Sequence, residues 1–217
     1  MREMNHIRIA IDGPSGSGKS TAAKNLAALL GIEYIDTGAM YRAVALKALK
    51  NGIPAEEEAI GKMLENTDID FSGGAVLLDG KEVGNEIRTL EVSAAASGIA
   101  ALQSCRSKLV EIQRAIASRK SVVMDGRDIG SNVLPDAEYK FFVSASIGAR
   151  AYRRWLEIRE KDGVTLEEVE EDLRRRDHND TTRALNPLIK VDDAIEIITD
   201  DIGIQETAAL MRSYIKE

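Results

Sequence analysis

Eight residues near the start of the chain have the types and spacing of a phosphate-binding loop. Residues 13–20, GPSGSGKS, match the pattern G-x-x-x-x-G-K-[ST] at every fixed position. Glycine lets the backbone approach a ligand closely, so successive N–H groups can surround an anion at the start of a helix. Lys19 can reach the β- and γ-phosphates of a nucleoside triphosphate, and the Ser20 hydroxyl suits a Mg²⁺ ion. We therefore expect this loop to bind a nucleoside triphosphate.

A second polar segment, residues 34–42 (YIDTGAMYR), follows the next predicted strand. Thr37 offers a hydroxyl group and Arg42 a planar guanidinium that can grip a phosphate. Because the carboxyl ends of parallel strands meet at one edge of a sheet, these side chains are expected near the first loop. A helix N-cap followed by a solvated arginine is the alternative interpretation.

A third polar segment, residues 121–130 (SVVMDGRDIG), joins a β-branched run to charged residues. Asp125 ends the run, at the place where a phosphate-loop enzyme needs a carboxylate near Mg²⁺ and its waters. Gly126 allows close approach, and we expect Arg127 and Asp128 to project into the same cleft. A purely structural turn is the alternative.

The segment from residue 162 to 190 carries much charge and interrupts the pattern of the chain. Thr165 and Glu168 form a predicted capping box for a helix of about 11 residues. The following sequence, RRRDHNDTTRALNPL, contains few apolar residues and cannot form a core. It is expected to be either a solvated, partly mobile segment or a lid over a ligand.

Short strands and helices alternate along the chain, as in a parallel sheet covered by helices. The predicted strands are residues 7–11, 32–35, 121–124, 139–143 and 195–198, and the predicted helices are residues 19–30, 38–50, 89–117, 146–161 and 203–216. Residues 68–88 depart from this pattern, because turn signals at 72–74 and 79–80 separate short apolar runs. We expect a small antiparallel sheet there, inserted into the α/β plan.

The length, composition and net charge of the chain exclude several classes of protein. The chain has 217 residues, 44% of them hydrophobic, which suits one globular domain. It has no apolar run of about 20 residues and no apolar N-terminal segment, so we expect a cytoplasmic protein without a membrane partner. The single cysteine excludes an intrachain disulfide. The net charge of −7 argues against nucleic-acid binding.

In combination, the phosphate loop, the D-T-G-A-M-Y-R and D-G-R-D motifs and the R-R-D-x-x-D-x-x-R segment resemble the bacterial cytidylate kinases, or CMP kinases. The resemblance covers essentially the whole chain. It implies a three-layer phosphate-loop fold with a five-stranded parallel sheet, a small antiparallel-sheet insertion and a helical lid. The whole chain, residues 1–217, would then be one kinase domain. The insertion that binds the monophosphate would span about residues 63–100, and the lid about residues 158–188.

The implied reaction is transfer of the γ-phosphate of ATP to CMP or dCMP, with Mg²⁺, in pyrimidine nucleotide metabolism. We expect the enzyme to be a monomer whose partners are these small molecules. The implied ATP-phosphate residues are Gly13, Pro14, Ser15, Gly16, Ser17, Gly18, Lys19, Ser20 and Thr21. Mg²⁺ would be held by Ser20 and, through water, by Asp125.

The resemblance also implies which residues bind the acceptor. Arg42, Arg127 and Arg183 match the arginines that grip the CMP phosphate, and Thr37 supplies a hydroxyl at a position where serine is common. Ser97, Arg106 and Asp128 match residues that recognise the cytosine edge. Arg176 and Asp180 match lid residues near the sugar and phosphates. The residues expected to act in catalysis are Lys19, Arg127, Asp128, Arg176 and Arg183.

The sequence departs from the cytidylate kinase pattern at one place, and two alternative functions stay open. The segment SASIGARAYRR lacks the acidic residue expected two or three positions before Arg150, so contacts to adenine are not assigned. Another nucleoside monophosphate kinase, with UMP or AMP as acceptor, is the main alternative. A regulatory GTPase is a distant one, because the N/T-K-x-D motif that recognises guanine is missing: the only K-x-D, residues 190–192, follows Ile189.

Overall fold

The computed structural model describes residues 6–72 and 74–216. Gly73 of the predicted turn at 72–74 lies outside the described residues, as do the two ends of the predicted domain, residues 1–5 and 217. The chain divides into two compact units. One contains Glu33–Val122, and the other contains Ile7–Ile32 and Val123–Glu217.

The predicted five-stranded parallel sheet is confirmed. Its order is β2-β6-β1-β7-β8, with β1 at Arg8–Asp12, β2 at Glu33–Asp36, β6 at Val122–Gly126, β7 at Tyr139–Ser144 and β8 at Ile195–Ile198. Strand β7 pairs in parallel with both β1 and β8; Phe141 lies opposite Ile11 on one side and Ile195 on the other. The central strands are mostly apolar because both faces of a parallel sheet are covered, and Ile9, Ala10 and Ile11 have no exposed surface.

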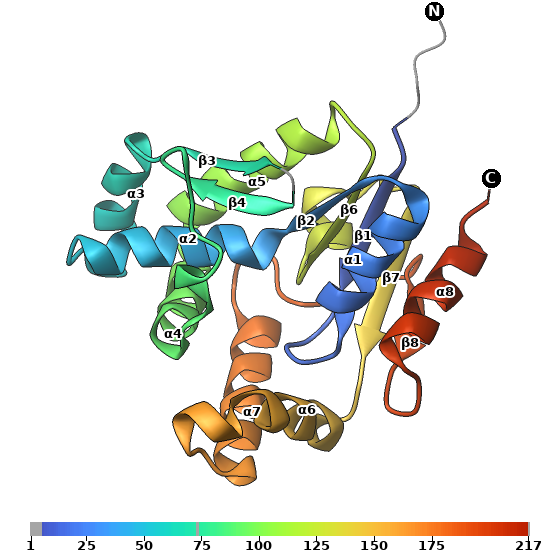
Figure 1. The fold of residues 1–217 in the computed structure, drawn as a ribbon. Coiled ribbons are helices and arrows are strands. Elements are labelled where there is room, and N and C mark those ends of the chain that lie inside the picture. Colours follow the sequence, from blue (N-terminus) through green and yellow to red (C-terminus); the bar gives the residue numbers. More distant parts are fainter. Residues whose placement is uncertain (1–5, 73, 217) are drawn as a thin grey trace, which may run out of the picture. The chain divides into compact units, whose positions relative to one another are not determined.

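Four helices belong to the unit that holds β1 and β7 (Figure 1). They are α1 (Lys19–Leu30), α6 (Ile147–Asp162), α7 (Leu166–Thr182) and α8 (Ile204–Tyr214), with a short helical turn at Ile129–Val133. Helix α1 begins at Lys19, within the last two residues of the phosphate loop, and packs against α8. The loop therefore lies between a buried strand and a packed helix, which restricts its backbone.

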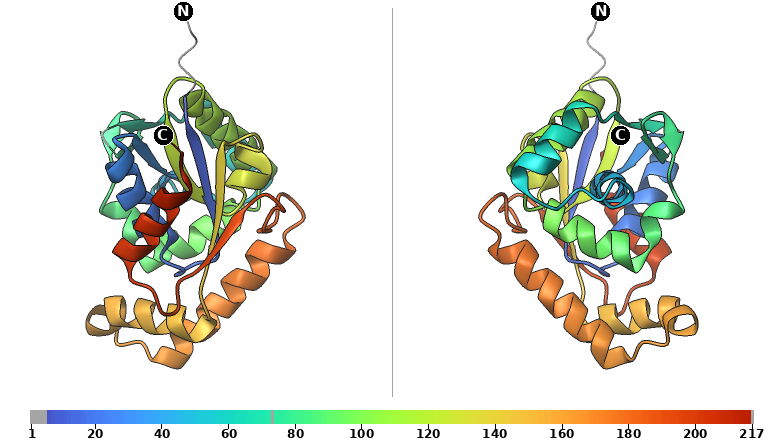
Figure 2. Two further views of the ribbon diagram at one scale, coloured as in Figure 1. Left: turned by 90° about the vertical axis from the view of Figure 1, so that its right-hand side faces the viewer. Right: turned by 90° about the vertical axis from the view of Figure 1, so that its left-hand side faces the viewer.

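Helices α6 and α7 pack against each other as a hairpin (Figure 2), and this hairpin has a small core of its own. Ala151, Val169 and Leu173 are buried there, and Trp155 packs against them. The predicted capping box is present, since Thr165 Oγ1 accepts from Glu168 N and Glu168 Oε2 accepts from Thr165 N. The hairpin therefore has its own fixed internal structure.

Helix α7 is longer than predicted, with 17 residues in place of about 11. Its second half is polar, but ion pairs one helical turn apart support it. Arg174 pairs with Glu170, and Arg175 and Arg176 both pair with Asp172. The prediction of a segment without a core was right for residues 174–182, which are helical, and wrong for Leu188, which is buried.

The other unit contains the predicted antiparallel sheet, which is confirmed. Its strands are β3 (Ile69–Ser72), β4 (Ala75–Leu78) and β5 (Lys81–Glu82), and Phe71 lies opposite Val76. The helices of this unit are α2 (Thr37–Lys50), α3 (Glu57–Glu65), α4 (Leu90–Ile99) and α5 (Gln103–Ala117), with a 3₁₀ turn at Glu86–Arg88.

The single helix predicted at residues 89–117 is wrong. The chain breaks at residues 100–102 into α4 and α5, and Leu102 adopts an extended conformation (φ −79°, ψ 133°). The carboxylate of Glu57 accepts hydrogen bonds from Gln103 N at 2.9 Å and Ser104 N at 2.6 Å. A side chain 46 positions earlier thus caps the new helix, which local sequence could not reveal.

Within the described ranges, no helix has both the length and the apolar character needed to span a bilayer.

Candidate functional site

The backbone of the phosphate loop is shaped by close packing and by glycine. A Cβ atom at Gly13 would lie 2.0 Å from the carbonyl oxygen of Val143, so no larger residue fits where the loop leaves β1. Gly18, the residue before α1, has a φ of 84°, a conformation that side chains disfavour. The loop thus leads directly into the N-terminus of α1, where an anion site would lie.

Two loop side chains have defined partners. Lys19 is 5% exposed, and its Nζ atom lies 3.1 Å from the carbonyl oxygen of Pro14. Ser20 Oγ donates to Asp125 Oδ2 at 2.6 Å. Asp125 is the next-to-last residue of β6 and is buried. The structure thus brings together the hydroxyl and the carboxylate that were predicted to hold Mg²⁺, and these are oxygen groups of the kind that this ion prefers.

The D-G-R-D turn and the end of α7 are joined by two ion pairs. Arg127 Nε lies 2.6 Å from Asp180 Oδ2, and Arg183 Nη2 lies 3.2 Å from Asp128 Oδ1. The side chains of Asp128 and Arg183 are almost fully buried. Four of the predicted acceptor residues therefore form one charged cluster.

Carboxylates around Arg127 keep it firmly charged. Burial alone would lower the pKa of the guanidinium, but the negative charges of Asp180 and Asp125 outweigh burial and raise the pKa. A permanently charged, partly buried arginine is suited to binding a phosphate.

Arg176 lies in a different electrostatic environment. Its Nε atom pairs with Asp172 Oδ2 at 2.8 Å on the same helix. Burial lowers the pKa of Arg176 and Asp172 opposes this, whereas the nearby positive charges of Arg154 and Arg127 lower the pKa further. Several positive charges thus lie near Arg176, and an anionic ligand would offset their mutual repulsion.

Thr37 and Arg42 lie at the start of α2, in the unit with β2. Asp36 caps this helix: its Oδ1 atom accepts from Ala39 N at 2.8 Å. Its Oδ2 atom accepts from Arg42 Nη2 at 2.9 Å, and the Arg42 side chain is 29% exposed. Arg42 is thus held in place by the capping carboxylate, and Thr37, the first helical residue, is buried.

Arg106 and Ser97 belong to the same unit as Arg42. Arg106 on α5 is 3% exposed, with its guanidinium carbon 5.9 Å from the centre of the Tyr41 ring and Nη1 donating to Ala100 O at 3.2 Å. Ser97 lies on α4 and is half-buried. A charged side chain at such depth needs polar partners, which makes Arg106 a candidate for ligand contact.

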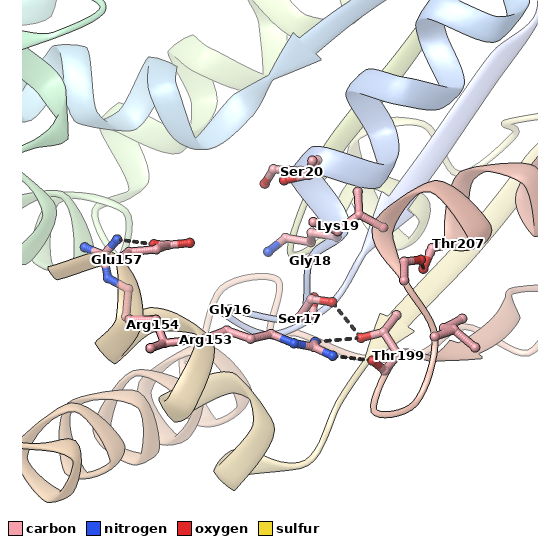
Figure 3. A pocket seen from close by; sticks show the side chains of 15 residues that line it. Gly16, Ser17, Gly18, Lys19, Ser20, Arg153, Arg154, Glu157, Thr199 and Thr207 are labelled. Carbon is pink, nitrogen blue, oxygen red and sulfur yellow. Dashed lines mark hydrogen bonds and ion pairs between the residues drawn. The ribbon is translucent and has the colours of Figure 1, made fainter. Parts of the chain in front are cut away.

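A pocket of about 590 Å³ adjoins the phosphate loop and includes residues that the sequence analysis did not assign (Figure 3). Helix α6 and the segment after β8 form its other walls. Thr199 Oγ1 donates to Ser17 O at 2.9 Å, and Arg153 of α6 donates to the carbonyl oxygen of Thr199. The sequence could have indicated Thr199 by its position alone, because Thr199 directly follows a strand of the parallel sheet and functional residues gather at such strand ends.

Arg150 is a second residue whose place the sequence did not reveal. Its Nη1 atom donates to Ser15 O at 3.0 Å, and Nη2 pairs with Asp177 of α7 at 2.6 Å. One buried guanidinium thus joins the phosphate loop to both helices of the hairpin. No local pattern predicts this, because the partners lie 135 positions before and 27 positions after Arg150.

Comparison with known proteins identifies the family. The cytidylate kinase family model matches residues 9–217. A cytidylate kinase from Clostridioides difficile is 49% identical over 214 residues, covering 98% of this chain and 99% of that protein, and one from Fervidobacterium nodosum is 45% identical over 213 residues, covering 98% and 97%. The solved structure of a shikimate kinase from Bacteroides thetaiotaomicron, 13% identical, has a TM-score of 0.50 over 96% of this chain and 97% of that one, a likeness of fold alone. On the family model and these identities, the chain belongs to the cytidylate kinase family.

Proposed function

We propose that this chain transfers the γ-phosphate of ATP to CMP or dCMP, forming ADP and CDP or dCDP, and that the clusters described above bind the two nucleotides. Family membership supports the reaction. The single observation that carries the assignment of residues is the hydrogen bond of 2.6 Å between Ser20 Oγ and Asp125 Oδ2. It joins the phosphate loop to the strand end that precedes Arg127 and Asp128, so donor and acceptor groups share one edge of the sheet.

The donor side consists of residues 13–21. Backbone N–H groups and Lys19 would hold the ATP phosphates, and Ser20 with Asp125 would hold Mg²⁺, in part through water. The oxygen donors of this pair fit such an ion. Bound there, Mg²⁺ would neutralise phosphate charge.

On the acceptor side, we assign the CMP phosphate to Arg42, Arg127 and Arg183, with Thr37 as a hydroxyl donor. Asp128, Ser97 and Arg106 would recognise cytosine, and Arg176 and Asp180 would act near the sugar and phosphates. The carboxylates paired with these arginines keep the guanidinium groups oriented. The arginine side chains therefore lose less conformational entropy when a phosphate takes the place of the carboxylates.

Charge explains why so many cations are needed. ATP and CMP together bring about six negative charges, counting about two on a terminal phosphate. Lys19 and the arginines offset the repulsion as the reacting oxygens come into line. No strong base is required, because positioning and electrostatic stabilisation supply most of the rate in phosphoryl transfer.

We also propose roles for the two segments outside the central plan. The insertion at about residues 63–100 would bind the monophosphate, and about residues 158–188, which comprise the end of α6, all of α7 and the segment after it, would act as a lid. A lid excludes water, which would otherwise compete with CMP for the γ-phosphate. A cytoplasmic location, a monomeric state and the absence of nucleic-acid and membrane partners stay predictions.

A coupled assay of ADP formation tests the proposal, with CMP, dCMP, UMP, AMP and GMP as acceptors. We expect CMP and dCMP to lead in kcat/KM. A preference for UMP or AMP would support the alternative, another nucleoside monophosphate kinase. ADP formation without any acceptor would indicate a hydrolase and contradict the transfer. Family membership already argues against a regulatory GTPase.

A further inference from the structure

Asp12 is a buried carboxylate that the proposed reaction does not use. It is the last residue of β1, it immediately precedes Gly13 of the phosphate loop, and it is 5% exposed. Its two oxygens each accept one backbone hydrogen bond from the turn after β6. Ile129 N lies 2.8 Å from Oδ1, and Gly130 N lies 2.7 Å from Oδ2. One side chain thus joins the phosphate loop to the turn that carries Arg127 and Asp128.

These two N–H groups open the short helical turn Ile129–Val133, whose N-cap residue is Asp128. An aspartate at an N-cap ordinarily accepts such hydrogen bonds itself. Asp128 makes no capping bond. Its Oδ1 atom instead accepts from Arg183 Nη2 at 3.2 Å, and its Oδ2 atom accepts from Asn132 Nδ2 at 3.0 Å. Asp12, and not Asp128, therefore accepts the hydrogen bonds from the first N–H groups of this turn. The carboxylate of Asp128 pairs with Arg183 and Asn132.

We infer that Asp12 is a positioning residue for the acceptor: it fixes the turn 127–130 against the phosphate loop and so sets the positions of Arg127 and Asp128. This inference rests on the proposed function, in which Asp128 and Arg127 contact CMP. Displacement of the turn by even about 1 Å would impair acceptor binding and alignment.

The chemistry of the contact requires a carboxylate. An ionised carboxylate accepts both N–H groups, whereas an amide of the same shape would turn an NH₂ donor toward one of them. Burial raises the pKa of Asp12 to about 6, the two N–H groups lower it, Asp128 raises it and Lys19 lowers it. Arg127 also faces this charge. At neutral pH the side chain is therefore mostly ionised and able to make both bonds.

The test compares Asp12→Asn with a matched change at Glu138, a carboxylate that contacts the other end of β1. Glu138 Oε2 accepts from Arg8 N, the first residue of β1, at 2.7 Å. Glu138→Gln therefore makes the same carboxylate-to-amide change away from the proposed site. For Asp12→Asn we expect KM for CMP to rise about 10-fold and kcat to fall, while KM for ATP changes less than about 3-fold. For Glu138→Gln we expect the ratio of the two KM values to stay at the wild-type level.

If Asp12 had only a structural role, Asp12→Asn would lower the melting temperature without changing the ratio of KM for CMP to KM for ATP. Equal rises of both KM values in Asp12→Asn, or none, would overturn the inference while an active wild type preserves the proposed function. An inactive wild type would refute the proposed function and with it the inference.

A milder variant covers the case in which Asp12→Asn does not fold. A Cβ atom at Gly130 would lie 3.4 Å from Asp12 Oδ2 and 3.3 Å from Lys140 Cδ, so Gly130→Ala presses on the same contact. We expect a selective rise of about 3-fold in KM for CMP. An unchanged KM for CMP in this variant would overturn the inference.

Discussion

Arg127 Nε and Asp180 Oδ2 lie 2.6 Å apart, so the arginine of the D-G-R-D turn is ion-paired with helix α7. The next residue of the turn, Asp128, has the opposite charge and pairs with Arg183, three positions beyond Asp180. In one pair the turn supplies the cation and in the other it supplies the anion. Together the two pairs hold the end of α7 against the turn. If these residues bind CMP, its phosphate must compete with Asp180 for Arg127, and the acceptor and the lid are coupled.

Removal of one partner of this pair should be costly. Asp180→Asn leaves a largely buried guanidinium without its carboxylate, and we expect a loss of about 1–3 kcal/mol in the free energy of unfolding. We also expect a higher KM for CMP, because Arg127 is no longer held in place and the proposed contact of Asp180 near the sugar is lost; these losses outweigh the removal of a competitor for Arg127. Urea denaturation and steady-state kinetics measure the two effects. The control is Glu196→Gln, which removes an exposed pair with Lys190 and should cost less than about 1 kcal/mol. Equal losses in the two variants would contradict the structural role of Asp180.

Lys19 is expected to act on the rate. In Lys19→Ala we expect kcat to fall about 10²-fold or more, because a positive charge at the transferred phosphate is lost. The control is Lys24→Ala, which removes an exposed lysine from the same helix and should keep wild-type kinetics. Circular dichroism melting checks that both variants fold. A folded Lys19→Ala with wild-type kcat would show that the loop is not the phosphate site.

The pKa of Asp12, about 6 against an ordinary value of 3.8, predicts a pH dependence of stability. The folded protein binds this proton more tightly than the unfolded chain does. The contribution of Asp12 to stability is therefore complete below pH about 4 and is lost as the pH rises through about 6. Asp12→Asn has no such titration.

The wild type should consequently gain stability relative to Asp12→Asn when the pH falls from 7.5 to 4.5. Urea denaturation of both proteins at the two pH values measures the difference, and other titrating groups cancel in the comparison. A difference that does not vary with pH would mean that the pKa of Asp12 is not raised.

The α6–α7 hairpin should respond to both nucleotides together. Its polar surface and small separate core favour local motion, which two bound ligands would suppress. Tryptic cleavage within residues 160–185 should slow when CMP and an unreactive ATP analogue are both present. Cleavage after Arg119, an exposed residue between α5 and β6, serves as the internal reference. Equal cleavage of the hairpin with and without the nucleotides would argue against a lid.

Local sequence predicted the parts of the fold that local forces determine. The strands and the loop at residues 13–20 follow from apolar runs and glycine spacing, and the capping box from Thr165 and Glu168. The break between α4 and α5 was missed because Glu57, distant in sequence, caps α5. Asp12 was missed for a similar reason: its partners lie 117 and 118 positions later.

Recognition of cytosine depends on Asp128 in the proposed site. Cytosine presents an exocyclic amino donor where uracil presents a carbonyl oxygen, so uracil would face the carboxylate acceptor to acceptor. Buried hydrogen-bonding groups left unpaired in this way discriminate by about 10²-fold or more.

The most direct measurement is therefore kcat/KM for CMP and for UMP in the wild type, in Asp128→Ala and in Asp192→Ala, which removes an exposed carboxylate outside the proposed site. We predict a CMP preference of about 10²-fold or more in the wild type and in Asp192→Ala. In Asp128→Ala that preference should shrink, mainly through loss of activity with CMP, while KM for ATP changes little. A wild type that prefers UMP, or an Asp128→Ala variant that keeps the wild-type CMP/UMP ratio, would contradict the account.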